Sequence, residues 1–199
     1  MKLKALATTL ILLLPPAVSA DIAVDFTGRL VSEARAQMGV TTVYDPAYVS
    51  LSYPNGDIAR ERGVCTDVVI RALRDTADVD LQQLVHEDMN RNFARYPTIW
   101  GLKRTDKNID HRRVPNLETY FDRMNTGLPL SSAASDYAAG DIVTWRLPGN
   151  LPHIGIISDK TDADGTPLVI HNIGAGTQEE NILFRFKMIG HYRPAPDAF

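Results

Sequence analysis

The stretch GVCTDVVIRALR, Gly63 to Arg74, contains the only cysteine of the 199-residue chain and opens a segment with helical hydrophobic spacing. Apolar residues share one face of a helix predicted over Thr66–Ala77, at Val68, Val69, Ala72 and Leu73. Asp67 in the first turn suits the positive end of the helix dipole. The pattern therefore predicts an amphipathic helix with Cys65 at its N-terminal end.

Outward from this helix, the chain divides into a helical half and a β-rich half. Helical spacing recurs at Phe26–Met38, Leu81–Phe93 and Asn116–Asn125. The β-rich runs, separated by turn residues, are Asp141–Leu147, His153–Ser158, Pro167–Ile173 and Leu183–Tyr192. Helices followed by an antiparallel meander are typical of the α+β class. We expect N-terminal helices packed on a C-terminal antiparallel β-sheet.

The first twenty residues, 1–20, have the pattern of a cleaved secretory signal peptide. Lys2 and Lys4 precede a short apolar run, and Val18-Ser19-Ala20 supplies small residues for cleavage. The apolar run is too short to span a bilayer, and no later stretch is long enough. We predict an exported protein without a membrane span, periplasmic in a Gram-negative source, with residues 21–199 forming a single domain.

The net charge and the cysteine content limit the classes of function that we consider for this protein. The net charge of −3 argues against a nucleic-acid-binding protein, which would present a basic face. A single cysteine permits no intramolecular disulfide, so in an oxidising compartment Cys65 is a candidate reactive thiol. The alternative is a buried, inert cysteine that packs as a small hydrophobic residue. A helix N-terminus and the nearby Arg60 and Arg62 are features that lower a thiol pKa, unless this arginine-rich loop is simply solvated.

A nucleophilic cysteine needs a base and a group that orients the base. Of the five histidines, His153 and His171 lie in β-rich runs and are bracketed by apolar residues. Two adjacent antiparallel strands would bring such side chains to about 5 Å between Cβ atoms. Together with Cys65, these two residues predict a Cys-His-His site.

The runs GDIVTW, HIGIIS and VIHNIG resemble the strands of the NlpC/P60 cysteine peptidases of the papain-like clan. The resemblance implies a papain-like fold with Cys65 as nucleophile, His153 as base and His171 as the orienting residue. It also implies that Tyr44, in AQMGVTTVY, helps to bind the oxyanion. Asn172 is the reserve candidate for the third catalytic position.

Two departures separate the chain from that pattern. The family usually has Asp-Cys-Ser at the nucleophile, where this chain has Val64-Cys65-Thr66. The interval from Cys65 to His153 is also long, and it contains an insertion, Arg91–Pro115, that we expect to cover or shape the cleft. The resemblance therefore supports an inference about the type of reaction more strongly than one about the preferred substrate.

The wider pattern resembles the domain family of unknown function DUF1287 still more closely. The matching stretches are YPNGDIARERGVCTDVVIRALR, DLQQLVHEDM, NIDHRRVPNL, GDIVTWRL, HIGIISD, VIHNIGAGTQEE and GHYR. They are distributed over almost all of residues 21–199, so we interpret that whole range as one domain of this family.

The leading hypothesis is an exported cysteine hydrolase, an endopeptidase or amidase, that forms a thioacyl-enzyme and needs no cofactor. Its expected partners are peptidoglycan stem peptides or their muropeptide fragments. A second hypothesis is a non-catalytic periplasmic module that binds the cell wall or acts as a scaffold. A third is a metal site formed by His153, His171 and either Asp88 or Asp110, although the chain lacks a compact ligand motif such as His-Glu-x-x-His.

Overall fold

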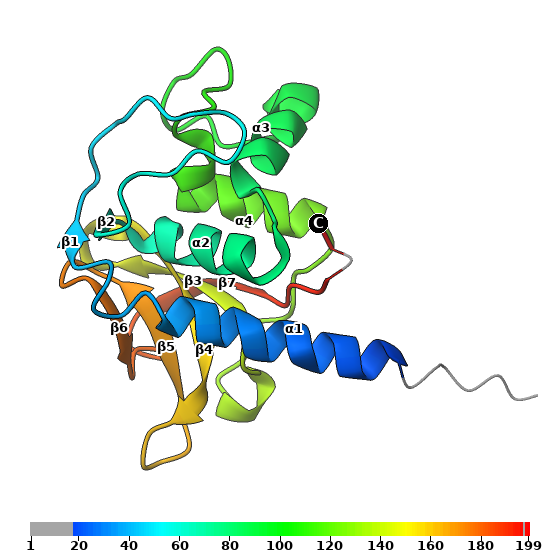
Figure 1. Ribbon diagram of the computed structural model, residues 1–199, viewed down its shortest axis with the longest axis vertical. Helices are drawn as coiled ribbons and strands as arrows, with labels where there is room; N and C mark the ends of the chain where they lie inside the picture. The colour runs from blue at the N-terminus through cyan, green and yellow to red at the C-terminus, as the bar shows by residue number, and fades with distance from the viewer. Residues whose placement is uncertain (1–17, 197) are drawn as a thin grey trace, which may run out of the picture.

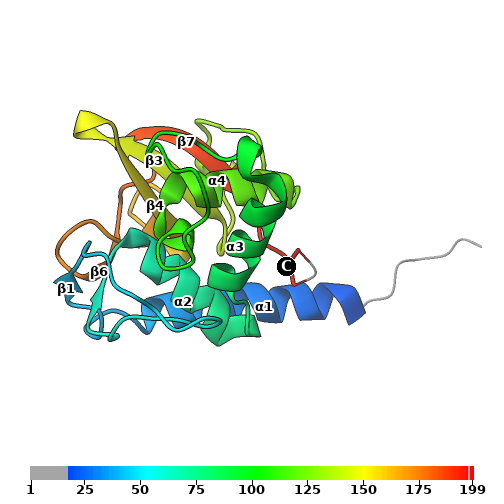
Figure 2. The same cartoon turned by 90° about the horizontal axis from the view of Figure 1, so that it is seen from above.

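The computed structural model describes residues 18–196 and 198–199, and this part of the chain has an α+β architecture (Figure 1). Its four α-helices are α1 (Val18–Arg35), α2 (Cys65–Ala77), α3 (Leu81–Asn92) and α4 (Val114–Arg123). Helices α1 and α2 run side by side, α4 also contacts the sheet, and α3 packs on α2 and α4 (Figures 1 and 2). The expected α+β class is confirmed.

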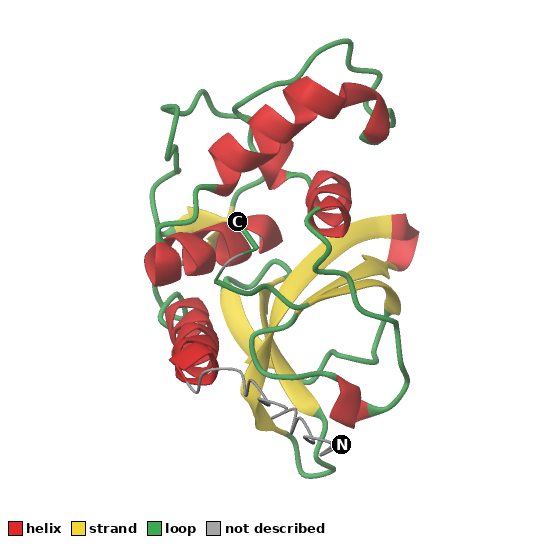
Figure 3. Ribbon diagram, turned by 90° about the vertical axis from the view of Figure 1, so that its right-hand side faces the viewer, coloured by secondary structure: helices red, strands yellow, loops and turns green. Residues whose placement is uncertain are grey.

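The sheet has five antiparallel strands in the order β6-β5-β4-β3-β7. The strands are β3 (Ile142–Leu147), β4 (Leu151–Thr161), β5 (Pro167–Asn172), β6 (Thr177–Glu180) and β7 (Lys187–Tyr192). The two-residue strands β1 (Val43–Tyr44) and β2 (Arg62–Gly63) form a separate parallel pair. The α-helices gather along one side of the large sheet (Figure 3).

Each face of the sheet has its own apolar cluster. Ile154, Ile156 and Ile170 belong to the cluster that contains the helices. Trp145 and Val169 belong to a second cluster, completed by residues such as Leu183 that follow β6. Successive strand residues point to opposite faces, which places His153 and His171 on the face of Trp145.

The boundaries of several elements differ from the predicted ones. Helix α1 begins at Val18 and ends at Arg35 instead of running from Phe26 to Met38, and the positive φ of Gly39 (74°) belongs to the turn that follows it. Only 187–192 of the predicted run Leu183–Tyr192 forms a strand, because Ile182 and Leu183 instead fold onto the second face of the sheet.

Most of the predicted signal peptide, residues 1–17, lies outside the described residues. Residues 18–20 form the first turn of α1. Among the described residues, no helix has the length and apolar character needed to cross a bilayer.

Candidate active site

Cys65 is the first residue of α2 and lies in the wall of a hollow of about 210 Å³. The turn that presents it is held by Asp67, whose carboxylate accepts a hydrogen bond from the backbone N–H of Val64 at 2.7 Å. The same carboxylate forms a buried ion pair with Arg112 at 2.9 Å. Asp67 is buried, and its carboxylate makes both of these interactions. It therefore fixes the start of α2 and, with it, the position of the Cys65 thiol.

The segment Arg91–Pro115 supplies much of the remaining wall of this hollow. Trp100, Arg113 and Pro115 line it, and the Arg113 guanidinium stacks over the Trp100 ring at 4.2 Å from the ring centroid. Cation–π stacking of this kind fixes an otherwise exposed loop side chain. The insertion therefore shapes the surroundings of the thiol, as expected from its place in the sequence.

The thiol is protonated at neutral pH. Burial raises the pKa of Cys65 to about 12, although the nearby backbone N–H of Ile154 acts in the opposite direction. The expectation that Arg60 and Arg62 lower this pKa is wrong. Arg60 forms an ion pair with Asp75 at 2.6 Å, and Arg62 forms one with Asp45 at 2.9 Å. Their charges are thus engaged by other carboxylates, and Cys65 is a neutral thiol.

The two strand histidines form a hydrogen-bonded pair. Nε2 of His153 on β4 lies 3.0 Å from Nδ1 of His171 on β5, and both side chains are buried. Burial, together with the neighbouring His171, lowers the pKa of His153 to about 3. His153 is therefore a neutral imidazole at physiological pH, the form in which it can accept a proton.

A carboxylate that the sequence analysis did not single out stands at the far end of this pair. Oε2 of Glu180 on β6 lies 3.1 Å from Nε2 of His171, although the two groups are not aligned as a hydrogen bond. The contact therefore acts through charge. The pKa of His171 is lowered because burial outweighs the attraction of Glu180.

Glu180 gives the histidine chain a preferred arrangement of protons. The nearby carboxylate favours a proton on Nε2 of His171, which leaves Nδ1 of His171 to accept a hydrogen bond from Nε2–H of His153. Assigned from this network, the remaining nitrogen of His153, Nδ1, carries a free lone pair. This tautomer is the one that a general base requires.

Cys65 lies beside β4 at the level of His153. Pro152, which precedes the histidine, shares the 210 Å³ hollow with the thiol, and the backbone N–H of Ile154, which follows it, is near the sulfur. Within residues 18–196, Sγ of Cys65 makes no hydrogen bond with His153. Hydrogen bonds between catalytic groups are often long in unliganded enzymes and tighten with substrate.

The structure also brings Tyr44 to the thiol. The pairing of β1 with β2 sets Tyr44 opposite Gly63, just before α2, and Tyr44 lines the same hollow as Cys65. Partial desolvation, and to a lesser extent the neighbouring Cys65, raises the pKa of Tyr44, although the side chain is exposed. Its hydroxyl is therefore protonated and able to donate a hydrogen bond.

Asn172 is directed away from the histidines. Its side-chain Nδ2 donates to the carbonyl of Gly63 at 3.2 Å, and its Oδ1 accepts from the backbone N–H of Gly174 at 3.1 Å. Among the described residues it bonds to neither His153 nor His171. Its contacts tie the end of β5 to the segment that precedes α2.

The carboxylates considered for a metal site are engaged elsewhere. Asp88 forms an ion pair with Arg123 at 2.6 Å, and Asp110 accepts a hydrogen bond from the backbone N–H of Asp106 at 2.5 Å. The part of the chain that the structure describes contains no group of three or more metal-ligating side chains. The structure does not bring His153 and His171 together with either aspartate.

The fold and site together define an α+β domain with a thiol at the N-terminus of a helix that contacts the sheet, and with a buried, carboxylate-linked histidine pair on that sheet. Residues 31–194 match the protein family described as "Domain of unknown function (DUF1287)", and the chain belongs to that family. It is also similar to "Uncharacterized protein YijF" of Escherichia coli (strain K12). The two are 66% identical over 160 residues, which cover 80% of this chain and 78% of that protein.

Proposed function

We propose that the protein is an exported cysteine hydrolase, of papain-like NlpC/P60 type, that cleaves amide bonds in peptidoglycan stem peptides. The observation that carries the proposal is the His153–His171 hydrogen bond of 3.0 Å, formed on strands that contact the helix of the only cysteine. Pro152, next to His153, lines the same hollow as Cys65. Three separate elements, α2, β4 and β5, contribute these groups. The periplasmic location rests on the signal-peptide pattern of residues 1–20.

In the proposed reaction, Nδ1 of His153 accepts the proton of Cys65 as the sulfur attacks the carbonyl carbon. Because the thiol pKa is raised to about 12, proton transfer accompanies attack instead of preceding it as a stable ion pair. The backbone N–H groups at the start of α2 and the Tyr44 hydroxyl stabilise the oxyanion. His153 then protonates the leaving amine, and a thioacyl-enzyme remains.

Water completes the cycle. His153 takes a proton from the water molecule, the hydroxide attacks the thioester carbonyl, and the sulfur leaves and regains a proton as the acid is released. His171 holds the His153 imidazole in its required tautomer, and Glu180 favours the positive charge that develops on the pair. Glu180 is thus a positioning residue that acts through His171.

The test is mass spectrometry of muropeptides after incubation with the wild-type protein and with Cys65→Ala. Wild type should release products with a new carboxyl and a new amine, and Cys65→Ala should release none while keeping the wild-type Tm. Activity retained in the Cys65→Ala variant would contradict the proposal.

A non-catalytic module that binds the cell wall is the second candidate. The observation that favours it is the protonated, buried thiol, which makes no hydrogen bond with His153 within the described residues. Co-sedimentation with peptidoglycan distinguishes the two functions. Equal binding by wild type and Cys65→Ala, together with the absence of any product from wild type, would favour the module.

A further inference from the structure

The segment from Arg95 to Lys107 has a charge opposite in sign to that of the whole chain. Four of its side chains are cationic and only Asp106 is acidic, which gives a net charge of +3, whereas the whole chain carries −3. The Asp106 carboxylate accepts a hydrogen bond from the Tyr48 hydroxyl at 3.1 Å. The four cations are exposed, and within the described residues none of them forms an ion pair; they are Arg95, Lys103, Arg104 and Lys107. The segment therefore presents a positively charged surface.

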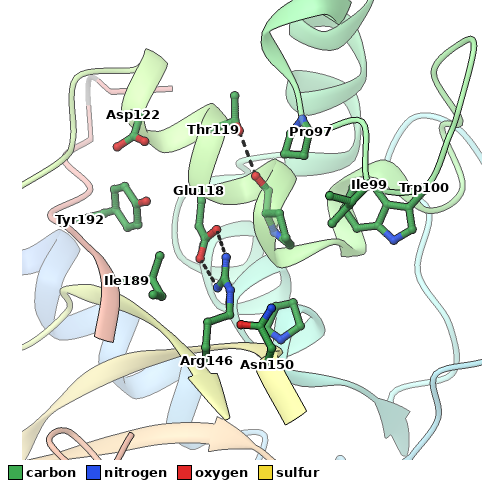
Figure 4. A pocket seen from close by; sticks show the side chains of 12 residues that line it. Pro97, Ile99, Trp100, Glu118, Thr119, Asp122, Arg146, Asn150, Ile189 and Tyr192 are labelled. Atoms are coloured by element: carbon green, nitrogen blue, oxygen red, sulfur yellow. Dashed lines mark hydrogen bonds and ion pairs between the residues drawn. The ribbon is translucent and has the colours of Figure 1, made fainter. Parts of the chain in front are cut away.

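The same segment exposes two large apolar side chains at the corners of a tight turn. The backbone N–H of Gly101 donates to the Thr98 carbonyl at 2.9 Å, so Ile99 and Trp100 occupy the two central positions of a β-turn. Ile99 is 69% exposed and Trp100 is 36% exposed, although such positions usually carry polar residues, proline or glycine. Figure 4 shows the two side chains next to each other on one side of a hollow of about 590 Å³. The Arg113 guanidinium stacked over the Trp100 ring holds the indole there.

The segment lies at one end of the molecule, where contacts with α3 hold it. In Figure 1 it belongs to the green loop beside α3, and the turn between β4 and β5 lies at the opposite end. Residues 159–164, at that opposite end, include three aspartates and one lysine. The Thr105 hydroxyl donates to the Asn90 side chain at 2.6 Å, and the Lys107 carbonyl accepts from Nε2 of Gln82 at 3.0 Å. The two ends of the molecule therefore differ in the sign of their charge.

A bilayer surface with anionic headgroups matches both properties of the segment. Each basic residue near such a surface strengthens binding about five-fold, and tryptophan favours the level of the lipid headgroups. The negative charge on the rest of the chain orients the molecule, because only this end is attracted to the headgroups. A soluble polyanion would use the cations but would gain nothing from the exposed Ile99.

We propose that the 95–107 surface docks the protein on a bilayer that contains anionic phospholipids. Ile99 and the Trp100 indole enter the headgroup region, and the four cations contact the phosphates around them. The protein then lies on the bilayer without spanning it. Because Trp100 also lines the hollow that contains Cys65, docking holds that hollow close to the membrane. The proposal involves no catalysis, so it stands or falls independently of the hydrolase.

Co-sedimentation with lipid vesicles tests the docking. The protein is purified after export, with whatever processing residues 1–20 undergo, so that wild type and variants share one N-terminus. Vesicles of pure phosphatidylcholine are compared with vesicles that also contain about 30% phosphatidylglycerol, which supplies the anionic surface. Wild type should bind the mixed vesicles about ten-fold more tightly or better, and added salt should weaken this binding. Equal binding to both kinds of vesicle would overturn the proposal.

A matched pair of charge variants locates the surface. Lys103→Gln/Arg104→Gln should weaken binding to the mixed vesicles about 30-fold, the effect of two basic residues at an anionic surface. Arg185→Gln/Lys187→Gln removes the same charge from two exposed residues before and on β7, and it should change the affinity less than about two-fold because these residues lie outside the surface. Equal losses in the two double variants would overturn the proposal.

Tryptophan fluorescence shows whether the turn itself enters the bilayer. Of the two tryptophans, Trp145 is buried and its indole donates to the Leu183 carbonyl at 2.9 Å, so a change on vesicles reports Trp100. We expect its emission to move to shorter wavelength and its quenching by acrylamide to fall. Ile99→Ser should weaken binding and this shift, and Leu130→Ser, which replaces a 50% exposed leucine elsewhere, should change neither.

Three results of these measurements would contradict docking on a membrane. They are vesicle binding without the Trp100 shift, equal effects of Ile99→Ser and Leu130→Ser, and a complex with soluble heparin but none with vesicles. The last result would assign the 95–107 surface to a polyanion instead. An unchanged Tm in each variant separates loss of binding from loss of fold.

Discussion

Two buried histidine clusters on the same sheet differ in what their ring nitrogens can do. His191 on β7 uses both nitrogens, with Nε2 at 2.7 Å from Asp141 and Nδ1 at 3.3 Å from the Pro129 carbonyl. Arg193 holds the same aspartate at 2.7 Å. His153 uses Nε2 for His171, and within the described residues its Nδ1 makes no hydrogen bond. A fully bonded histidine stabilises a fold, whereas a histidine with an unbonded ring nitrogen is able to accept a proton.

The largest expected difference between the two clusters comes from replacing His153 and His191 by glutamine, one at a time. His153→Gln should lower kcat/KM about 10³-fold, because a general base supplies rate factors of roughly 10² to 10⁴, and should change Tm little. His191→Gln should lower Tm and leave kcat/KM per folded molecule nearly unchanged. Thermal unfolding and muropeptide cleavage, measured on both variants, give the answer.

The opposite pattern would break the comparison. If His153→Gln mainly lost stability while His191→Gln mainly lost activity, His191 and its aspartate would be the functional cluster.

Replacing Glu180 should change the rate less than replacing His153, because Glu180 acts through His171. Its charge favours protonation of His171, so Glu180→Gln should lower the pKa of the histidine pair and move the acid limb of the kcat/KM profile to lower pH. We expect a loss of about five-fold in kcat at the pH optimum, comparable to one part-exposed ion pair. The measurement is the pH–rate profile between pH 2.5 and 9, with Glu179→Gln as the neighbouring control.

Glu180→Asp should restore part of the rate and of the wild-type acid limb. A profile that merely drops in height, with the acid limb in place, would assign Glu180 a structural role only.

The remaining expected effect concerns stability in acid. The pKa of His111 and that of His153 are lowered by burial to about 3 from the model-peptide value of 6.5. Between these values the unfolded chain binds more protons, so the free energy of unfolding falls as pH decreases from 6.5 to 3. Asp110 acts in the opposite direction between about pH 6 and 3.8, because burial raises its pKa to about 6.

His111→Phe should therefore flatten the acid limb of the stability curve by up to about 1.4 kcal/mol per pH unit. Urea denaturation at pH values from 4 to 7 measures this slope. The same slope in wild type and His111→Phe would show that this histidine titrates normally. His111→Gln is the control that separates loss of the titrating group from the effect of the phenylalanine ring.

Much of the framework around the thiol could be predicted from the sequence. The spacing of Val68, Val69, Ala72 and Leu73 predicts a helix that the structure places at Cys65–Ala77. Strand alternation in HIGIIS and PLVIHN predicts that His153 and His171 share one face, and their rings are hydrogen-bonded there. These inferences succeed because each depends on a short, regular period.

The groups that tune the site could not be predicted in the same way. Strand β6, with the sequence TQEE, has no apolar alternation, so nothing local placed Glu180 beside His171. The ion pairs that engage Arg60 and Arg62 depend on Asp75 and Asp45, which are 15 and 17 positions away in the chain. Burial of the thiol likewise depends on the packing of α2 against β4.

The central claim, that Cys65 attacks an amide carbonyl with His153 as its base, is tested most directly by intact-mass spectrometry. Wild type and His153→Gln are mixed with muropeptides, quenched in acid within the first turnover and digested to locate any adduct. The account predicts an acyl adduct on Cys65 in wild type and none in His153→Gln. Product release without an adduct on Cys65, at a rate unchanged by Cys65→Ala, would contradict it.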